Sequence, residues 1–135
     1  MKKIFRVIIT ILLVFIIGII YMSCITNNNQ DYLTSITKDI QKNYHINEKI
    51  IYSNKYGNYY IFKTNSKVIV LNHEYKEVLK ESTSKIKELS EDYPLIYKTN
   101  KLMYEHTITN NNKITYKYYD AKTGDLIKTT TMEKK

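Results

Sequence analysis

The strongest constraint in the sequence is an apolar run from Ile4 to Met22, in which Arg6 is the only strongly polar residue. As a helix, this run would rise roughly 28 Å at about 1.5 Å per residue, close to a hydrocarbon thickness of about 30 Å. Two lysines precede the run, and no basic residue comes after it until Lys38. The positive-inside rule therefore predicts a single-pass transmembrane helix, with a cytoplasmic N-terminus and an extracellular C-terminal domain.

Two other interpretations of this segment stay open. A cleaved secretory signal needs small residues at its cleavage site, and the run contains no alanine. A lipoprotein signal would make Cys24 the lipidated first residue, and Ser23 supplies the small residue before it. That pattern usually has Leu and a small residue where this chain has Tyr21 and Met22. The sequence favours an uncleaved anchor, with lipidation at Cys24 as the alternative.

Charge and cysteine content limit the rest of the chain. The formal charge is +8, and the three basic residues at the start of the chain leave +5 for the remaining residues. A surface of that sign favours anionic neighbours such as lipid head groups or wall polymers. One cysteine, Cys24, excludes an intrachain disulfide, so the domain must be stable through packing alone.

Hydrophobic spacing predicts a helix and then a sheet after a polar linker at residues 25–30. Apolar residues recur at intervals of three and four in Asp31–Tyr44, which indicates a helix. The period then changes to two: Tyr59–Thr64 and Val68–Leu71 read as a hairpin, after an initial strand at Ile50–Tyr52. A short strand at Val78–Lys80 would complete this first meander.

A similar order of elements is predicted in the second half. Ser82–Tyr93 has helical spacing and ends before Pro94. Leu102–Thr109 and Ile114–Tyr118 predict a second hairpin, and Asp125–Thr130 predicts a final strand. The predicted fold class is α+β: an N-terminal transmembrane helix (residues 1–24 as anchor or signal) followed by two helix-plus-antiparallel-meander units. These units would be residues 31–80 and 81–135 of one extracytoplasmic domain, related either by duplication or by convergence on hairpin chemistry.

The C-terminal strands carry a family resemblance. Leu-Met-Tyr-Glu-His-Thr at 102–107 and Tyr-Tyr-Asp-Ala-Lys-Thr-Gly-Asp-Leu-Ile at 118–127 resemble the end of PepSY domains. Those domains commonly close with an aromatic strand, Asp-x-x-Thr-Gly and an apolar strand. The order of elements is similar to small membrane-anchored proteins of Gram-positive bacteria with tandem PepSY or cystatin-like halves. The resemblance implies an envelope protein without catalytic residues, and some members accompany secreted peptidases as inhibitors or regulators.

Motifs for catalysis and metal binding are weak. Ser82-x-x-Lys85 and Lys122-Thr-Gly124 match two elements of penicillin-binding proteins, but the Ser-Asp-Asn element is missing and the chain is too short for that fold. The three histidines lack metal-ligand spacing. The sequence predicts no catalytic residue, no metal site and no small-molecule cofactor.

Tyrosines and lysines near the C-terminus form the candidate binding surface. Three tyrosines beside three lysines would suit stacking and charge contacts with a polymer: Tyr116, Tyr118 and Tyr119 with Lys113, Lys117 and Lys122. Of these, the predicted binding surface consists of Tyr116, Lys117, Tyr119 and Lys122. The simpler alternative is that one tyrosine face packs on a helix. We therefore expect a non-catalytic, membrane-anchored binding or regulatory domain that acts on an envelope protein. The alternative is a binder of anionic polymer, such as wall polymer or DNA, at the cell surface.

Overall fold

One long helix and two antiparallel sheets make up the chain. The computed structural model describes residues 2–134, and it describes side chains for residues 7–22 and 30–134. The chain divides into two compact units, Met1–Ser35 and Ile36–Lys135. Helix α1 (Lys2–Asn43) is shared between the units: its residues up to Ser35 belong to the first unit, and its residues from Ile36 onward belong to the second. The eight strands all lie in the second unit.

The prediction of a transmembrane helix at Ile4–Met22 is wrong. Over the part of the chain that the structure describes, no helix combines the length and the apolar character that crossing a membrane requires. The predictions of a single-pass membrane protein, a cytoplasmic N-terminus and an extracellular domain depended on this helix and are corrected with it.

The alternatives for the N-terminal segment depend on residues beyond the described side chains. Lipidation was predicted at Cys24, next to Ser23, and both side chains lie outside the described residues. In the backbone, α1 continues through residues 25–30, where the sequence predicted a polar linker.

The first sheet is a four-stranded antiparallel meander. Its strands lie in sequence order: β1 (Tyr52–Tyr56), β2 (Tyr59–Lys63), β3 (Lys67–Leu71) and β4 (Glu77–Ser82). The hairpin predicted from Tyr59 is confirmed, because β2 and β3 pair antiparallel with Phe62 opposite Ile69. Gly57, with φ of 56°, closes the tight turn between β1 and β2.

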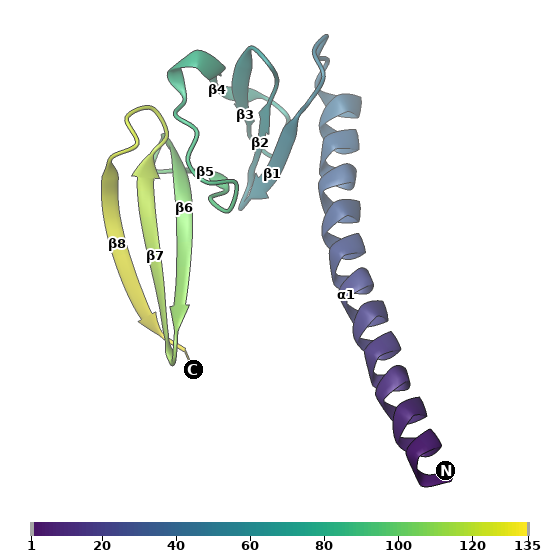
Figure 1. The fold of residues 1–135 in the computed structure, drawn as a ribbon. Helices are drawn as coiled ribbons and strands as arrows, with labels where there is room; N and C mark the ends of the chain where they lie inside the picture. The colour runs from purple at the N-terminus through teal and green to yellow at the C-terminus, as the bar shows by residue number, and fades with distance from the viewer. Residues whose placement is uncertain (1, 135) are drawn as a thin grey trace. The chain divides into compact units, whose positions relative to one another are not determined.

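The second sheet repeats the meander with longer strands. It consists of β5 (Leu95–Lys98), β6 (Lys101–Asn110), β7 (Lys113–Asp120) and β8 (Leu126–Glu133). Figure 1 shows β6, β7 and β8 running together, with the β6–β7 turn and the end of β8 at one tip. The strand order makes β8 an edge of the sheet.

The second predicted helix, Ser82–Tyr93, does not form. The segment contains a single 3-10 turn, η1 (Thr83–Lys85), and continues without regular structure to Pro94. Its backbone donors bond to other segments: the Thr83 N–H donates to the Ser66 carbonyl at 3.0 Å, and the Lys87 N–H donates to the Ala121 carbonyl at 2.9 Å. The predicted fold class is therefore wrong in this half also, because one meander has no helix before it.

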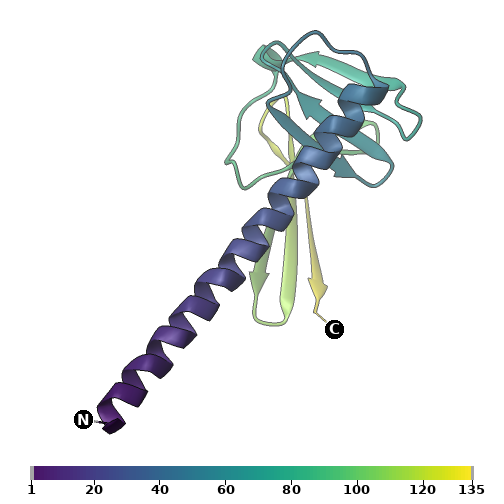
Figure 2. The ribbon, with the colours of Figure 1, turned by 90° about the vertical axis from the view of Figure 1, so that its right-hand side faces the viewer.

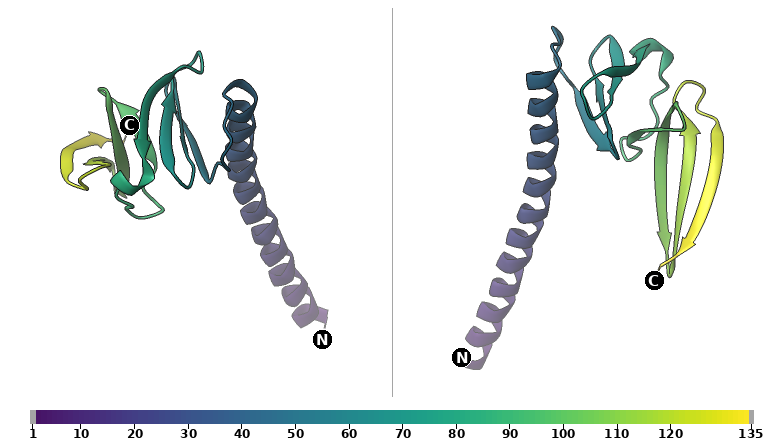
Figure 3. Two further views of the ribbon diagram at one scale, coloured as in Figure 1. Left: turned by 90° about the horizontal axis from the view of Figure 1, so that it is seen from above. Right: turned by 180° about the vertical axis from the view of Figure 1, so that it is seen from behind.

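The two faces of the first sheet bury different cores. On one face Phe62, Ile69 and Leu71 pack with Ile36 and Ile40 from the end of α1. The intervening residues of the same strands point the other way and pack with the second sheet, in a cluster that includes Ile61, Val68, Val70, Leu95, Leu102, Tyr104 and Ala121. Figure 3 shows the two sheets as separate layers of this unit. Both faces of β3 are buried, which explains why its sequence from Val68 to Leu71 is apolar at every position.

Candidate binding site

The long strands of the second sheet continue past the core. Leu102, Met103 and Tyr104 are buried at the start of β6, but Thr107 and the residues after it in β6 are exposed. In β8 every position except Thr130 is exposed, including Ile127 (44%) and Met132 (57%). Figure 2 shows β6–β8 extending away from the first sheet as a three-stranded ribbon. This ribbon is the largest part of the second unit that the core does not bury.

Strand pairing arranges one face of the ribbon in rows. Successive strand residues alternate between faces, so residues paired across strands share a face. The pocket face, as we call it, has three rows: Glu105–Tyr118–Lys128, Thr107–Tyr116–Thr130 and Thr109–Ile114–Met132. Each row runs from β6 through β7 to the edge strand β8. The β8 end of each row therefore meets the open edge.

A pocket of about 500 Å³ lies over this face and is lined by residues of all three rows, from Glu105 in the first to Met132 in the third. Its wall combines residues of the ribbon with Tyr56 at the end of β1 and with Lys98 and Thr99 of the β5–β6 turn. The ribbon contributes Tyr116 and Tyr118 to the same wall. Three tyrosines from two sheets therefore surround a space large enough for one or two side chains.

The β5–β6 turn sets the position of a cation in the pocket. Thr99 and Asn100 both have positive φ, 51° and 58°, as a two-residue type I′ hairpin requires. A β-branched residue rarely adopts this conformation, so Thr99 is strained. The turn places the Lys98 Nζ 5.4 Å from the centroid of the Tyr118 ring, within the range of a cation–π interaction.

The electrostatics of the pocket favour protonated tyrosines. Burial, followed by the charge of Glu105 and a hydrogen bond to it, raises the pKa of Tyr118 to about 12. Burial and the same carboxylate also raise the pKa of Tyr56. Both hydroxyls stay protonated near neutral pH and are hydrogen-bond donors. Within the described part of the chain, neither Lys98 nor Lys128 forms a salt bridge.

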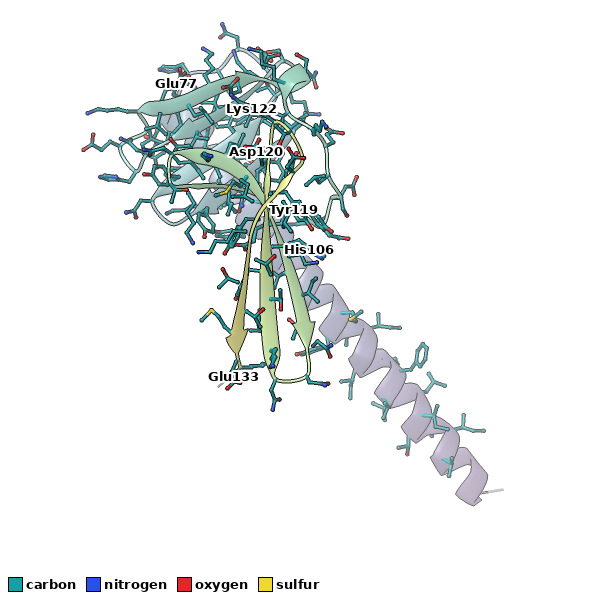
Figure 4. All side chains as sticks on the ribbon, turned by 90° about the vertical axis from the view of Figure 1, so that its left-hand side faces the viewer. Glu77, His106, Tyr119, Asp120, Lys122 and Glu133 are labelled. Carbon is teal, nitrogen blue, oxygen red and sulfur yellow. The ribbon has the colours of Figure 1, made fainter. Side chains whose placement is uncertain are left out.

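The opposite face of the ribbon has different chemistry. The ring of His106 stacks on Tyr93 with centroids 4.2 Å apart, and Tyr93 stacks on Tyr119 at 5.8 Å. Figure 4 shows His106 and Tyr119 near the middle of the sheet. Lys113 and Lys117 alternate with the pocket-face residues of β7 and therefore lie on this opposite face.

The structure separates the residues of the predicted binding surface. Tyr116 lines the pocket, whereas Lys117 and Tyr119 lie on the opposite face. Lys122 lies in the β7–β8 turn, where its Nζ is 2.5 Å from the Glu81 carboxylate. Figure 4 shows Lys122 beside the first sheet, far along the ribbon from Glu133. The four residues do not form one surface.

Sequence reasoning missed most residues of the pocket wall as site residues, among them Glu105, Lys98 and Lys128. The alternation of β7 was a usable signal for Tyr118, since it separates Tyr116 and Tyr118 from Lys117 and Tyr119. No local signal assigns Lys98 to the same pocket. For metals, no group of three or more His, Cys, Asp or Glu side chains suitable as ligands occurs among the described residues.

Comparison with protein-family models, with curated proteins and with solved structures finds no match to this chain. The resemblance of residues 102–127 to the end of PepSY domains therefore stays a prediction. The fold and the site define a small domain of two antiparallel meanders, with a tyrosine-lined pocket next to an open sheet edge. This geometry suits the binding of an extended chain.

Proposed function

We propose that this chain is a non-catalytic binding domain that takes an extended segment of a partner protein along β8, as a further strand of the second sheet. The observation that carries the proposal is the open edge itself. Strand β8 has eight residues and an exposed side chain at all but one of them. Edge strands present backbone donors and acceptors that can pair with another chain. Strand addition is an established mode of peptide recognition.

The hydrogen bonding of the ribbon identifies the backbone groups that face outward. The Lys134 N–H donates to the Asn112 carbonyl at 2.6 Å, just beyond the end of β8. In an antiparallel pair, residues alternate between those bonded to the neighbouring strand and those turned away from it. Counting back from Lys134, the backbones of Thr130 and Lys128 face β7. Those of Thr129 and Thr131 face the open edge.

Protection of this edge is slight. Natural edge strands are commonly shielded by proline, by charged residues or by a bulge. Strand β8 contains no proline, and Lys128 is its only lysine. An irregularity in register at Tyr118–Tyr119 affects the first residues of the strand and leaves the register from Lys128 to Glu133 regular. A partner strand would therefore find a continuous edge over these residues.

The chemistry of the pocket supports binding more than catalysis. A general base near neutral pH needs a pKa close to the working pH. The raised pKa values of Tyr56 and Tyr118 leave both hydroxyls protonated there. The Tyr56 hydroxyl is suited to donating a hydrogen bond to a bound segment, whereas the Tyr118 hydroxyl donates to Glu105.

An anionic polymer is the second candidate ligand. Lys113 and Lys117 lie on the face of β7 opposite the pocket, and the whole chain has a formal charge of +8. Such a face attracts polyanions through a sequence-independent term that weakens steeply with salt. This function would not need the open edge of β8.

Selection of peptides from a random dodecapeptide display library on the full chain tests the proposal. We expect enriched peptides to bind the Thr129→Ala variant almost as tightly as the unchanged chain. Thr129→Pro should weaken them about tenfold or more, because proline removes an outward donor. Proline is tolerated at an edge position whose N–H faces solvent, so the fold should survive; circular dichroism of both variants checks this.

Two results would reject strand addition. The first is equal binding of the enriched peptides to Thr129→Pro and Thr129→Ala. The second is an absence of enriched peptides together with binding to heparin or duplex DNA that falls steeply with salt and is weakened by Lys117→Gln. That second result would favour the polymer ligand.

A further inference from the structure

We infer that the segment bound by β8 has an acidic side chain opposite Lys128 and an apolar side chain opposite Met132, with an uncharged residue between them opposite Thr130. This inference rests on the proposed function, because it needs a strand paired with β8. The inference specifies the sequence pattern of the bound segment, whereas an open edge alone would accept many sequences.

The rows of the pocket face determine what a fifth strand would meet. The first row runs Glu105, Tyr118, Lys128, so a strand added beyond β8 would extend it at Lys128. In the same way it would extend the row of Thr130 and the row that ends in Met132. Cross-strand neighbours stabilise a sheet most when opposite charges pair and when apolar side chains pair.

Two positive charges on the pocket face favour a carboxylate next to Lys128. Lys128 is the cross-strand neighbour of Tyr118, and the Lys98 ammonium lies over the ring of the same tyrosine. Both lysines line the pocket, and in the described chain neither is in a salt bridge. Glu105 lies at the β6 end of this row, with Tyr118 between it and Lys128. A carboxylate arriving at the edge would meet ammonium groups before it met Glu105.

The other end of the edge is apolar. Met132 is 57% exposed and pairs with Ile114 on β7. An apolar residue next to Met132 would bury apolar surface from both side chains, which is favourable. The edge therefore has a basic end and an apolar end, separated by Thr130.

Strand direction can be inferred from the bonding pattern of β8. Every pair in the second sheet is antiparallel, and we take the added strand to continue that pattern. Since the backbones of Lys128 and Thr130 face β7, these residues would form non-hydrogen-bonded pairs with the new strand. Such pairs bring side chains closest together. Read from its N-terminus, the bound segment is apolar, any residue, uncharged, any residue, acidic.

A second copy of the chain does not satisfy this pattern through β8. The pocket-face residues of β8 are Lys128, Thr130 and Met132, and none is acidic. Glu133 lies on the opposite face of the strand, where it pairs with Lys113. Two antiparallel copies of β8 would therefore leave Lys128 without a carboxylate neighbour. The inferred occupant is therefore a segment of a different protein and not the β8 strand of a second copy.

A charge-reversal selection tests the pattern. Random dodecapeptides are selected in parallel on the unchanged chain, on Lys128→Glu and on Lys117→Glu. The last variant makes the same change in net charge on the opposite face. We expect acidic enrichment four positions after an apolar residue for the unchanged chain and for Lys117→Glu, and basic enrichment at that position for Lys128→Glu. A synthetic peptide with the pattern should lose about tenfold in affinity when its acidic residue is replaced by lysine.

The outcomes distinguish the inference from the proposed function. Peptides that need the Thr129 edge but show no acidic preference, or the same preference with Lys128→Glu, would overturn the pattern and leave strand addition intact. Peptides that ignore Thr129→Pro would overturn both. Sedimentation gives the third outcome: a dimer of the chain that Thr129→Pro dissociates would show that β8 pairs with itself, against the inferred partner.

Discussion

Glu48 shows how a single carboxylate can hold a turn. It lies before β1, and its carboxylate accepts hydrogen bonds from the hydroxyls of Thr64 and Ser66 at 2.7 Å. The Lys67 ammonium is 3.1 Å from the same group. These hydrogen bonds, with Lys67, lower the pKa of Glu48 to about 2. The β2–β3 turn is therefore fastened to the segment that leads into the sheet.

The lowered pKa predicts a loss of stability in acid. Because the folded pKa of Glu48 lies below its ordinary value of 4.5, its contribution is complete above about pH 4.5 and is lost as the pH falls toward about 2. Glu48→Gln should lower the urea midpoint at pH 7 and have little effect near pH 2. Glu91→Gln, at an exposed position, is the control. A Glu48→Gln deficit that is equally large at both pH values would contradict this role.

At the scale of elements, the end of α1 is fixed by what it covers. Ile36 and Ile40 are 5% and 0% exposed against the first sheet. Two tyrosine hydroxyls add polar contacts near the helix end: Tyr75 donates to Asp39 at 2.6 Å, and Tyr44 donates to Glu77 at 2.8 Å. Burial, followed by the hydrogen bond with Glu77, raises the pKa of Tyr44 to about 12. The helix end is an integral part of the second unit.

Removing one side chain from this contact should test that conclusion. Ile40→Ala is expected to cost about 2–5 kcal/mol in the free energy of unfolding, because it leaves a cavity between helix and sheet. Ile51→Ala makes the same chemical change at a residue that is 51% exposed, and it should cost under about 1 kcal/mol. Urea unfolding followed by circular dichroism measures both. Equal costs would mean that α1 contributes little to the stability of the sheet.

At the scale of the whole molecule, the buried cores and the proposed binding edge occupy different regions. The described side chains of β2 and β3 fill two cores, and Ile61, Phe62 and Val70 are fully buried. The ribbon beyond Tyr104 has half-buried and exposed side chains on both faces. A binding edge benefits from being outside the core, because a partner strand can then approach without disturbing it.

Hydrogen exchange should detect this division. Amides of residues 61–63 and 68–70 are expected to exchange at the rate of global unfolding, whereas those of residues 107–115 should exchange through local opening and therefore faster. A selected peptide should slow exchange at Thr129 and Thr131, whose N–H groups face the edge, more than at Thr130. Exchange measured by NMR resolves these residues. Uniform protection across both sheets would contradict the division.

The sequence by itself determined the local elements whose causes are local. Alternation at Tyr59–Thr64, followed by turn residues and the apolar run Val68–Leu71, predicted a hairpin, because alternation, turn residues and strand propensity act within a few residues. A stripe at spacings of three and four placed Ile36 and Ile40 on one helical face. Alternation along β7 also predicts that Tyr116 and Tyr119 lie on opposite faces of the strand, although the predicted binding surface combined them.

Only the tertiary structure decided the elements and the site that depend on distant partners. Ser82–Tyr93 has helical spacing, yet two of its backbone N–H groups bond outside the segment, to the carbonyls of Ser66 and Ala121. The pocket wall combines Tyr56 from the first sheet and Lys98 from the β5–β6 turn with residues of β7 and β8, which lie farther along the sequence. The physical reason is the same in both cases. Hydrogen bonds and burial between residues far apart in the chain outweigh local propensity, and no local pattern records them.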